Sequence, residues 1–122
     1  MQGRDPGYID TDLRYFSRHE PGLDGGRFDR MDSDFMRALD MARDVAEVPF
    51  EITDSFREDG SGSSHTLGLA VDIRAHSSYV RFRIVLGLLS AGFERIGVYD
   101  RHVHACGDPE RPRFSLWLGV SR

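Results

Sequence analysis

A carboxylate inside an otherwise apolar stretch is the feature that most constrains this fold. Residues 57–64 read R-E-D-G-S-G-S-S, a composition typical of a surface loop. Residues 67–73 are apolar except for Gly68 and Asp72, and they are too few for a stable helix, so they predict a buried strand over 70–73. Because a buried carboxylate is costly when it lacks a partner, Asp72 needs a cation or several hydrogen-bond donors facing it.

His65 lies on the loop that leads into this strand, seven residues before Asp72. The imidazole and the carboxylate could share a metal ion, and the alternative is a loop pair hydrogen-bonded to the backbone. Their odd spacing would place them on opposite faces of an ideal strand. The end of the loop and Gly68 must therefore turn the chain if the two side chains are to converge.

A second group of potential ligands occurs in H-V-H-A-C, residues 102–106. Residues two apart share a face of a strand, so His102, His104 and Cys106 would point the same way. One histidine could be a ligand and its neighbour an acid or base. Two histidines and an aspartate with an open fourth position suit a catalytic zinc, which lowers the pKa of bound water to about 7. Cys106 is a fourth ligand, a reactive thiol or a buried strand residue.

The pattern of apolar residues predicts two helices. The first begins with Asp32 or Ser33 as its cap and ends near residues 48–49, and the second begins at Ser77 or Ser78, with Gly92 as its left-handed C-terminal cap. Alternating or short apolar runs predict strands at 50–54, 70–73, 95–98, 102–105 and 114–118. This order predicts an α+β fold, a small mostly antiparallel sheet backed by two main helices, with the metal site on the sheet.

Composition and length limit the organisation and the partners. Residues 1–32 predict an irregular N-terminal arm and residues 33–122 the domain that carries the site, with no linker to separate two domains. The net charge of −4 and the dispersed arginines argue against nucleic acid as a partner. The longest uncharged apolar run, residues 84–92, is too short to span a membrane, and the N-terminus has no signal peptide.

Four ordered motifs resemble one family. The stretch S-S-H-T-L-G-L-A-V-D-I is similar to the S-x-H-x-x-G-x-A-x-D signature of the zinc D-Ala-D-Ala carboxypeptidase family, which includes vancomycin-resistance dipeptidases and phage endolysins. T-D-S-F-R resembles its T-S-G-Y-R, G-F-E-R-I-G-V-Y its G-F-x-R-I-G-I, and H-V-H-A its final F-I-H-V. The last stretch is also similar to the hedgehog signalling domain, which holds a related zinc site. The resemblance covers residues 35–117.

Carried over to this sequence, the resemblance implies one zinc ion per chain, held by His65, Asp72 and His104. It places Arg57 as the arginine that binds the substrate's carboxylate or carbonyl. Ser64 belongs to the substrate-binding part of the signature, where it supports the loop, because no Ser-His-Asp arrangement with an elbow surrounds it.

Two departures from the family pattern concern catalysis. Many members place a carboxylate three residues before the last histidine as general base, but Arg101 occupies that position here and Asp100 precedes it. The general base is therefore either Asp100 or His102. Members often read H-x-D at the last histidine, and here Cys106 replaces the aspartate.

The resemblance implies a zinc-dependent peptidase that hydrolyses peptidoglycan stem peptides, as a D-Ala-D-Ala carboxypeptidase or as an endolysin-type endopeptidase. The alternative is a non-catalytic, zinc-stabilised binding or virion-structural module that keeps the same site. Without a signal peptide, we expect a phage-type product that is made in the cytoplasm of the producing cell. It would then be released to the cell wall or carried in the virion.

Overall fold

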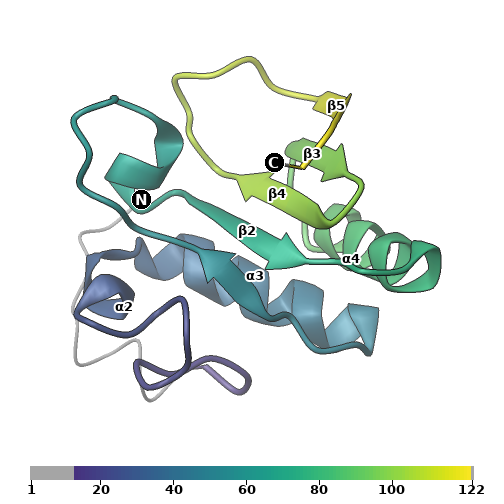
Figure 1. The fold of residues 1–122 in the computed structure, drawn as a ribbon, viewed down its shortest axis with the longest axis horizontal. Coiled ribbons are helices and arrows are strands. Elements are labelled where there is room, and N and C mark those ends of the chain that lie inside the picture. Colours follow the sequence, from purple (N-terminus) through teal and green to yellow (C-terminus); the bar gives the residue numbers. More distant parts are fainter. Residues whose placement is uncertain (1–12, 122) are drawn as a thin grey trace.

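The computed structural model describes residues 13–121 (Figure 1). Five strands form one sheet in the order β1-β2-β4-β3-β5. All neighbouring strands are antiparallel except β3 and β5, which are parallel. The strands are β1 (Ile52–Asp54), β2 (Ala70–Arg74), β3 (Arg95–Tyr99), β4 (His102–Cys106) and β5 (Ser115–Gly119). The predicted α+β fold, a small mostly antiparallel sheet with two main helices, is confirmed.

Two long helices begin at the predicted caps. In α3 (Ser33–Ala46) the Asp32 carboxylate accepts a hydrogen bond from the Phe35 amide at 2.9 Å. In α4 (Ser78–Ser90) the Ser77 hydroxyl accepts from the Val80 amide at 3.1 Å. The first helix ends two residues earlier than expected, because Glu47 adopts a left-handed conformation (φ 58°).

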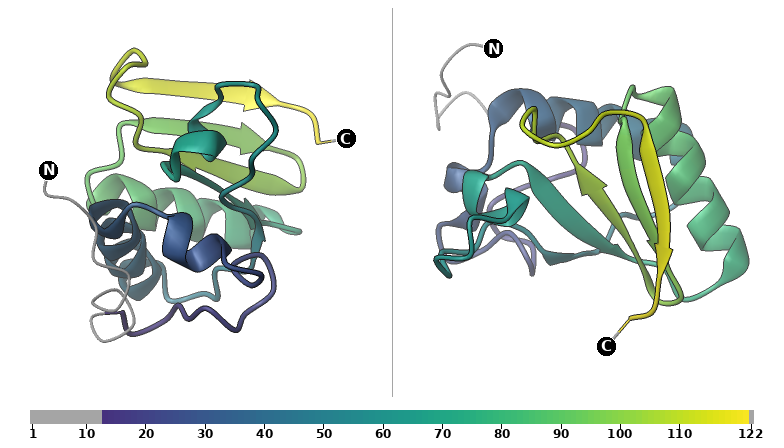
Figure 2. Two further views of the ribbon diagram at one scale, coloured as in Figure 1. Left: turned by 90° about the vertical axis from the view of Figure 1, so that its left-hand side faces the viewer. Right: turned by 90° about the horizontal axis from the view of Figure 1, so that it is seen from above.

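The two helices cover one face of the sheet and η1 (Ser64–Leu67), a short 3₁₀ helix, lies on the other (Figure 2). The helices approach closely where Gly87 of α4 faces the Ala42 carbonyl of α3, and a side chain at Gly87 would clash with that carbonyl. Val71, Ile73 and Val103 are buried where the sheet packs on the helices. Because side chains alternate along a strand, Asp72 of β2 and the two residues that flank Val103 in β4 point to the opposite face.

Residues 13–32 belong to the same hydrophobic core. Leu23, Phe28 and Met31 are fully buried, and Phe16 is almost so. A short helix, α2 (Arg27–Arg30), interrupts the stretch that the sequence predicts as irregular. Within the described part of the chain, no helix is long and apolar enough to cross a membrane.

The register of the strands places one residue from each of four strands in a row. Asp72 of β2 lies opposite His104 of β4, His104 lies opposite Gly97 of β3, and Gly97 lies beside Trp117 of β5. Partners in register point to the same face of a sheet. Since Gly97 has no side chain, the Trp117 ring occupies the space above it: a Cβ at Gly97 would lie 2.6 Å from the indole. This row forms the floor of the candidate site.

Candidate metal centre

His65 reaches the sheet from η1. Its Nδ1 atom lies 2.8 Å from the Ser55 carbonyl oxygen, which accepts a hydrogen bond from the ring. This bond fixes the proton on Nδ1 and leaves Nε2 free as a ligand, 3.8 Å from Asp72 Oδ1. The predicted turn is at Gly68, which has φ 70° and packs so closely on the Arg30 carbonyl that a side chain there would clash with it.

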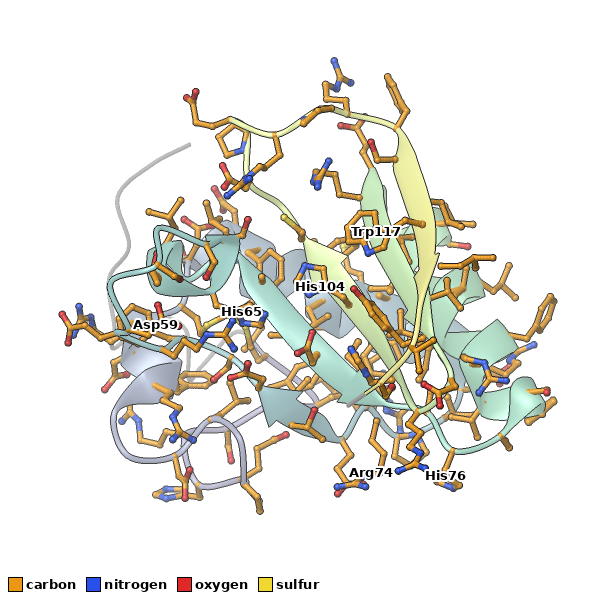
Figure 3. All side chains as sticks on the ribbon, turned by 45° about the horizontal axis from the view of Figure 1, so that its top comes forward. Asp59, His65, Arg74, His76, His104 and Trp117 are labelled. Atoms are coloured by element: carbon orange, nitrogen blue, oxygen red, sulfur yellow. The ribbon has the colours of Figure 1, made fainter. Side chains whose placement is uncertain are left out.

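Asp72 and His104 complete a cluster of three potential ligands. His104 Nδ1 lies 2.8 Å from Asp72 Oδ1, and one ligand atom from each of the three residues lies within 4.8 Å of the others. His65 is buried, whereas Asp72 and His104 are partly exposed. Figure 3 shows His65 of η1 next to His104 of β4, with Trp117 near His104 and with His76 far from both. Two imidazoles and a carboxylate so arranged could hold a divalent metal ion.

The charges of Asp72 and His104 support each other. Burial raises the pKa of Asp72. The hydrogen bond from His104 and the charges of His104 and His65 lower it by more than burial raises it, so the pKa lies below its usual range. For His104, burial lowers the pKa, but the hydrogen bond to Asp72 and the Cys106 thiol raise it to about 9. Without a metal the two form an ion pair, and a metal ion would replace a proton between them.

The cluster lies in a cleft of about 620 Å³. His102, two residues before His104, also lines this cleft. Its ring stacks on Tyr99 with a centroid distance of 4.2 Å, and its Nδ1 is 2.8 Å from the Ser121 hydroxyl. His102 is therefore held in one orientation beside the cluster.

Asp100, the other predicted candidate for the general base, does not line this cleft. Its carboxylate accepts a hydrogen bond from the Ser121 amide at 2.5 Å, which is the main reason that its pKa lies below the usual value. Ser121 thus connects the two candidates, since its amide binds Asp100 and its hydroxyl contacts His102.

The two residues predicted to bind substrate are both engaged within the protein. Arg57 lines the cleft, but its guanidinium makes ion pairs with Asp54 and, at 2.8 Å, with Asp59. Ser64 is buried, and its hydroxyl donates to the Asp108 carboxylate at 3.0 Å. The Cys106 thiol donates to the same hydroxyl at 3.2 Å.

Cys106 is a buried residue at the end of β4. Burial raises the pKa of its thiol, but hydrogen bonds with His104, Ser64, the Asp108 backbone and Arg95 lower it to about 7. It is not among the three ligands whose atoms lie within 4.8 Å of one another. In this structure its thiol belongs to the hydrogen-bonded group with Ser64 and Asp108.

Several residues of the cleft have no role in the sequence analysis. Tyr99, Arg95 and Trp117 line it, and the buried Asp108 carboxylate accepts the hydrogen bond from the Ser64 hydroxyl. Arg95 and Tyr99 do occur in G-F-E-R-I-G-V-Y. They share the face of His104 through the register of β3 and β4, which the sequence does not reveal. Comparison of the chain with known protein families, with curated proteins and with solved structures finds no match.

Proposed function

We propose that the protein is a zinc-dependent peptidase that hydrolyses peptidoglycan stem peptides. The observation that carries this proposal is the convergence of His65, Asp72 and His104 in an open cleft, with their ligand atoms within 4.8 Å of one another. The motifs around these residues resemble those of the zinc D-Ala-D-Ala carboxypeptidase family, and this resemblance supplies the class of substrate.

The donor set fits a catalytic zinc ion. Three protein ligands beside a cleft leave a fourth position for water or substrate, as catalytic zinc sites require. The Ser55 carbonyl orients His65 so that Nε2 faces Asp72. Zinc bound there would polarise the scissile carbonyl and lower the pKa of a water molecule to about 7.

His102 is the group in the cleft best suited to move the proton. Stacking on Tyr99 and the contact of Nδ1 with Ser121 leave Nε2 as the ring nitrogen that can exchange a proton with a reactant. In the proposed hydrolysis, water adds its oxygen to the carbonyl carbon and the C–N bond breaks. His102 takes the proton of the water and delivers it to the leaving amine.

Asp100 acts on this step from outside the cleft. Its carboxylate holds the Ser121 amide, and the Ser121 hydroxyl holds the His102 ring. We therefore assign Asp100 as a positioning residue and His102 as the general base and acid. The Asp100→Asn variant keeps an oxygen acceptor for the Ser121 amide, so it should retain most of the activity that a His102→Ala variant loses.

The test combines metal content with digestion of cell-wall fragments. Purified protein loaded with zinc and freed of excess metal is analysed for metal, then incubated with peptidoglycan and with a pentapeptide that ends in D-Ala-D-Ala. We expect one zinc ion per chain and a product found by mass spectrometry. Loss of one D-Ala identifies a carboxypeptidase, and cut cross-links or shortened stems identify an endopeptidase.

His104→Ala should lose both metal and products, whereas His76→Ala, which changes an exposed histidine, should retain both. One bound zinc ion without hydrolysis of any fragment would contradict the peptidase. It would support instead a non-catalytic, zinc-stabilised binding or virion-structural module. Iron retained in preference to zinc would contradict the assignment of the metal, because a site of two histidines and a carboxylate also suits iron.

A further inference from the structure

Three arginines line the cleft, and their charges are not equally compensated. Arg57 makes ion pairs with Asp54 and Asp59, and Arg111 lies 3.6 Å from the buried carboxylate of Asp108. Arg95 has no carboxylate within ion-pair distance among residues 13–121. A part-buried cation without a carboxylate partner favours an anionic ligand. Of the three arginines, Arg95 is therefore the one best suited to bind such a ligand.

Arg95 is the first residue of β3, and its side chain lines the cleft. It lies opposite Cys106 in the register of β3 and β4, and therefore on the same face of the sheet as His104. One terminal nitrogen donates to the Pro112 carbonyl at 2.5 Å. Its Nε atom is buried and has no hydrogen-bond partner among residues 13–121. A further hydrogen bond joins the guanidinium to the Cys106 side chain, and neither of these partners is a carboxylate.

Trp117 connects Arg95 with the metal cluster. The guanidinium carbon of Arg95 lies 5.1 Å from the centre of the indole, and the His104 ring lies 5.7 Å from it. A small ligand in contact with this indole can therefore reach both the arginine and the cluster. Arg95 and Cys106 also line a second hollow of about 410 Å³, so the two hollows adjoin at these residues.

We propose that Arg95 binds the terminal carboxylate of a peptide substrate whose scissile carbonyl faces His65, Asp72 and His104. This inference rests on the proposed peptidase function and specifies which peptides are its substrates. A guanidinium can bind a carboxylate with two parallel hydrogen bonds, whereas the amide of an internal residue offers no negative charge. The preferred substrate is then a peptide with a free C-terminus, and the enzyme is a carboxypeptidase and not an endopeptidase.

The test uses a ligand that cannot be hydrolysed, so that binding is measured without turnover. The phosphinate analogue of D-Ala-D-Ala, with a P–CH₂ unit in place of the scissile C–N bond, is prepared as the free acid and as the C-terminal amide. Both are titrated into zinc-loaded protein by calorimetry and by fluorescence of Trp117, the single tryptophan. We expect the acid to bind about tenfold to a hundredfold more tightly than the amide.

Arg95→Gln should remove this preference and leave the affinity for the amide unchanged, which also shows that the variant is folded. Arg95→Lys should keep part of the preference for the acid, because lysine has the positive charge but not the planar guanidinium that forms two parallel hydrogen bonds. The matched control is Arg27→Gln, which changes an exposed arginine that is paired with Asp24 and lines neither hollow, and it should keep the preference.

Three results would overturn the carboxylate site. The first is equal affinity of the wild type for the acid and the amide. The second is an unchanged preference for the acid in Arg95→Gln. The third is a preference for the acid that is lost in Arg57→Gln instead. Since the ligand is not hydrolysed, the outcome is separate from the digestion experiment. Acid-selective binding through Arg95 without hydrolysis of any peptide would support the site and contradict the peptidase.

Discussion

At the scale of single residues, the proton on His104 would compete with a metal ion bound at the cluster. The pKa of His104 is raised to about 9 by Asp72 and Cys106 against the effect of burial, so the residue is protonated at neutral pH when no metal is bound. Asp72 holds the opposite charge, because its pKa lies below the usual range. Binding must release one proton, since a histidine ligand is neutral.

We predict that the apparent zinc affinity rises about tenfold for each pH unit between about 6.5 and 9. The sign follows from competition: below the pKa of His104 a lower pH favours the protonated ring, and above it the competitor is gone. Titration against a chelator of known affinity at pH 6.5, 7.5 and 8.5 measures the slope. An affinity that stays constant over this range would show that His104 binds the metal without losing a proton or does not bind it.

At the scale of elements, the turn at Gly68 brings η1 and β2 together. Gly62 and Gly68 have nearly the same left-handed conformation, with φ 71° and 70°, but only Gly68 packs against another segment, at the Arg30 carbonyl. We predict that Gly62→Ala lowers the free energy of unfolding by about 1 kcal/mol and keeps the zinc affinity. Gly68→Ala should cost about 3 kcal/mol or more and weaken zinc binding, because the clash displaces η1 and with it His65.

Chemical denaturation and the same chelator titration measure both effects. Equal losses in the two variants would mean that the contact with Arg30 contributes nothing to the site. A Gly68→Ala protein that is less stable but binds zinc normally would mean that His65 finds its position independently of the turn.

The same elements show what could be predicted from the sequence. The two long helices and the five strands lie within a few residues of their predicted bounds, because each is encoded by a local period and the helices also by caps such as Asp32 and Ser77. The parallel pairing of β3 with β5 joins segments that no local pattern connects, and it alone brings Trp117 to the site. η1 ends at Gly68, which packs on the Arg30 carbonyl, and no local pattern encodes that contact either.

For the site, the predicted ligands His65, Asp72 and His104 lie together in the structure. The motifs place them, while the turn at Gly68 and the register of β2 with β4 bring their side chains to one point. The pairing of Arg57 with Asp54 and Asp59 depends on side-chain geometry that no motif specifies. The contrast between Arg57 and Arg95 could therefore be seen only in the structure.

At the scale of the whole molecule, the cluster joins side chains from three different elements. His65 belongs to η1, Asp72 to β2 and His104 to β4, and the loop before η1 is exposed from Arg57 to Gly62. A metal ion that binds all three residues binds the folded chain and not the unfolded one, so it stabilises the fold by mass action.

We predict that zinc at about a hundred times its dissociation constant adds about 2.7 kcal/mol to the free energy of unfolding. For a chain of this length, that corresponds to a rise in Tm of about 10 °C. Differential scanning calorimetry with and without zinc measures the shift, and His76→Ala should show it in full. In His104→Ala the shift should vanish, because one of the three segments is no longer tied to the metal. A shift of equal size in His104→Ala would place the stabilising metal elsewhere on the protein and would separate the stability of the fold from the cluster.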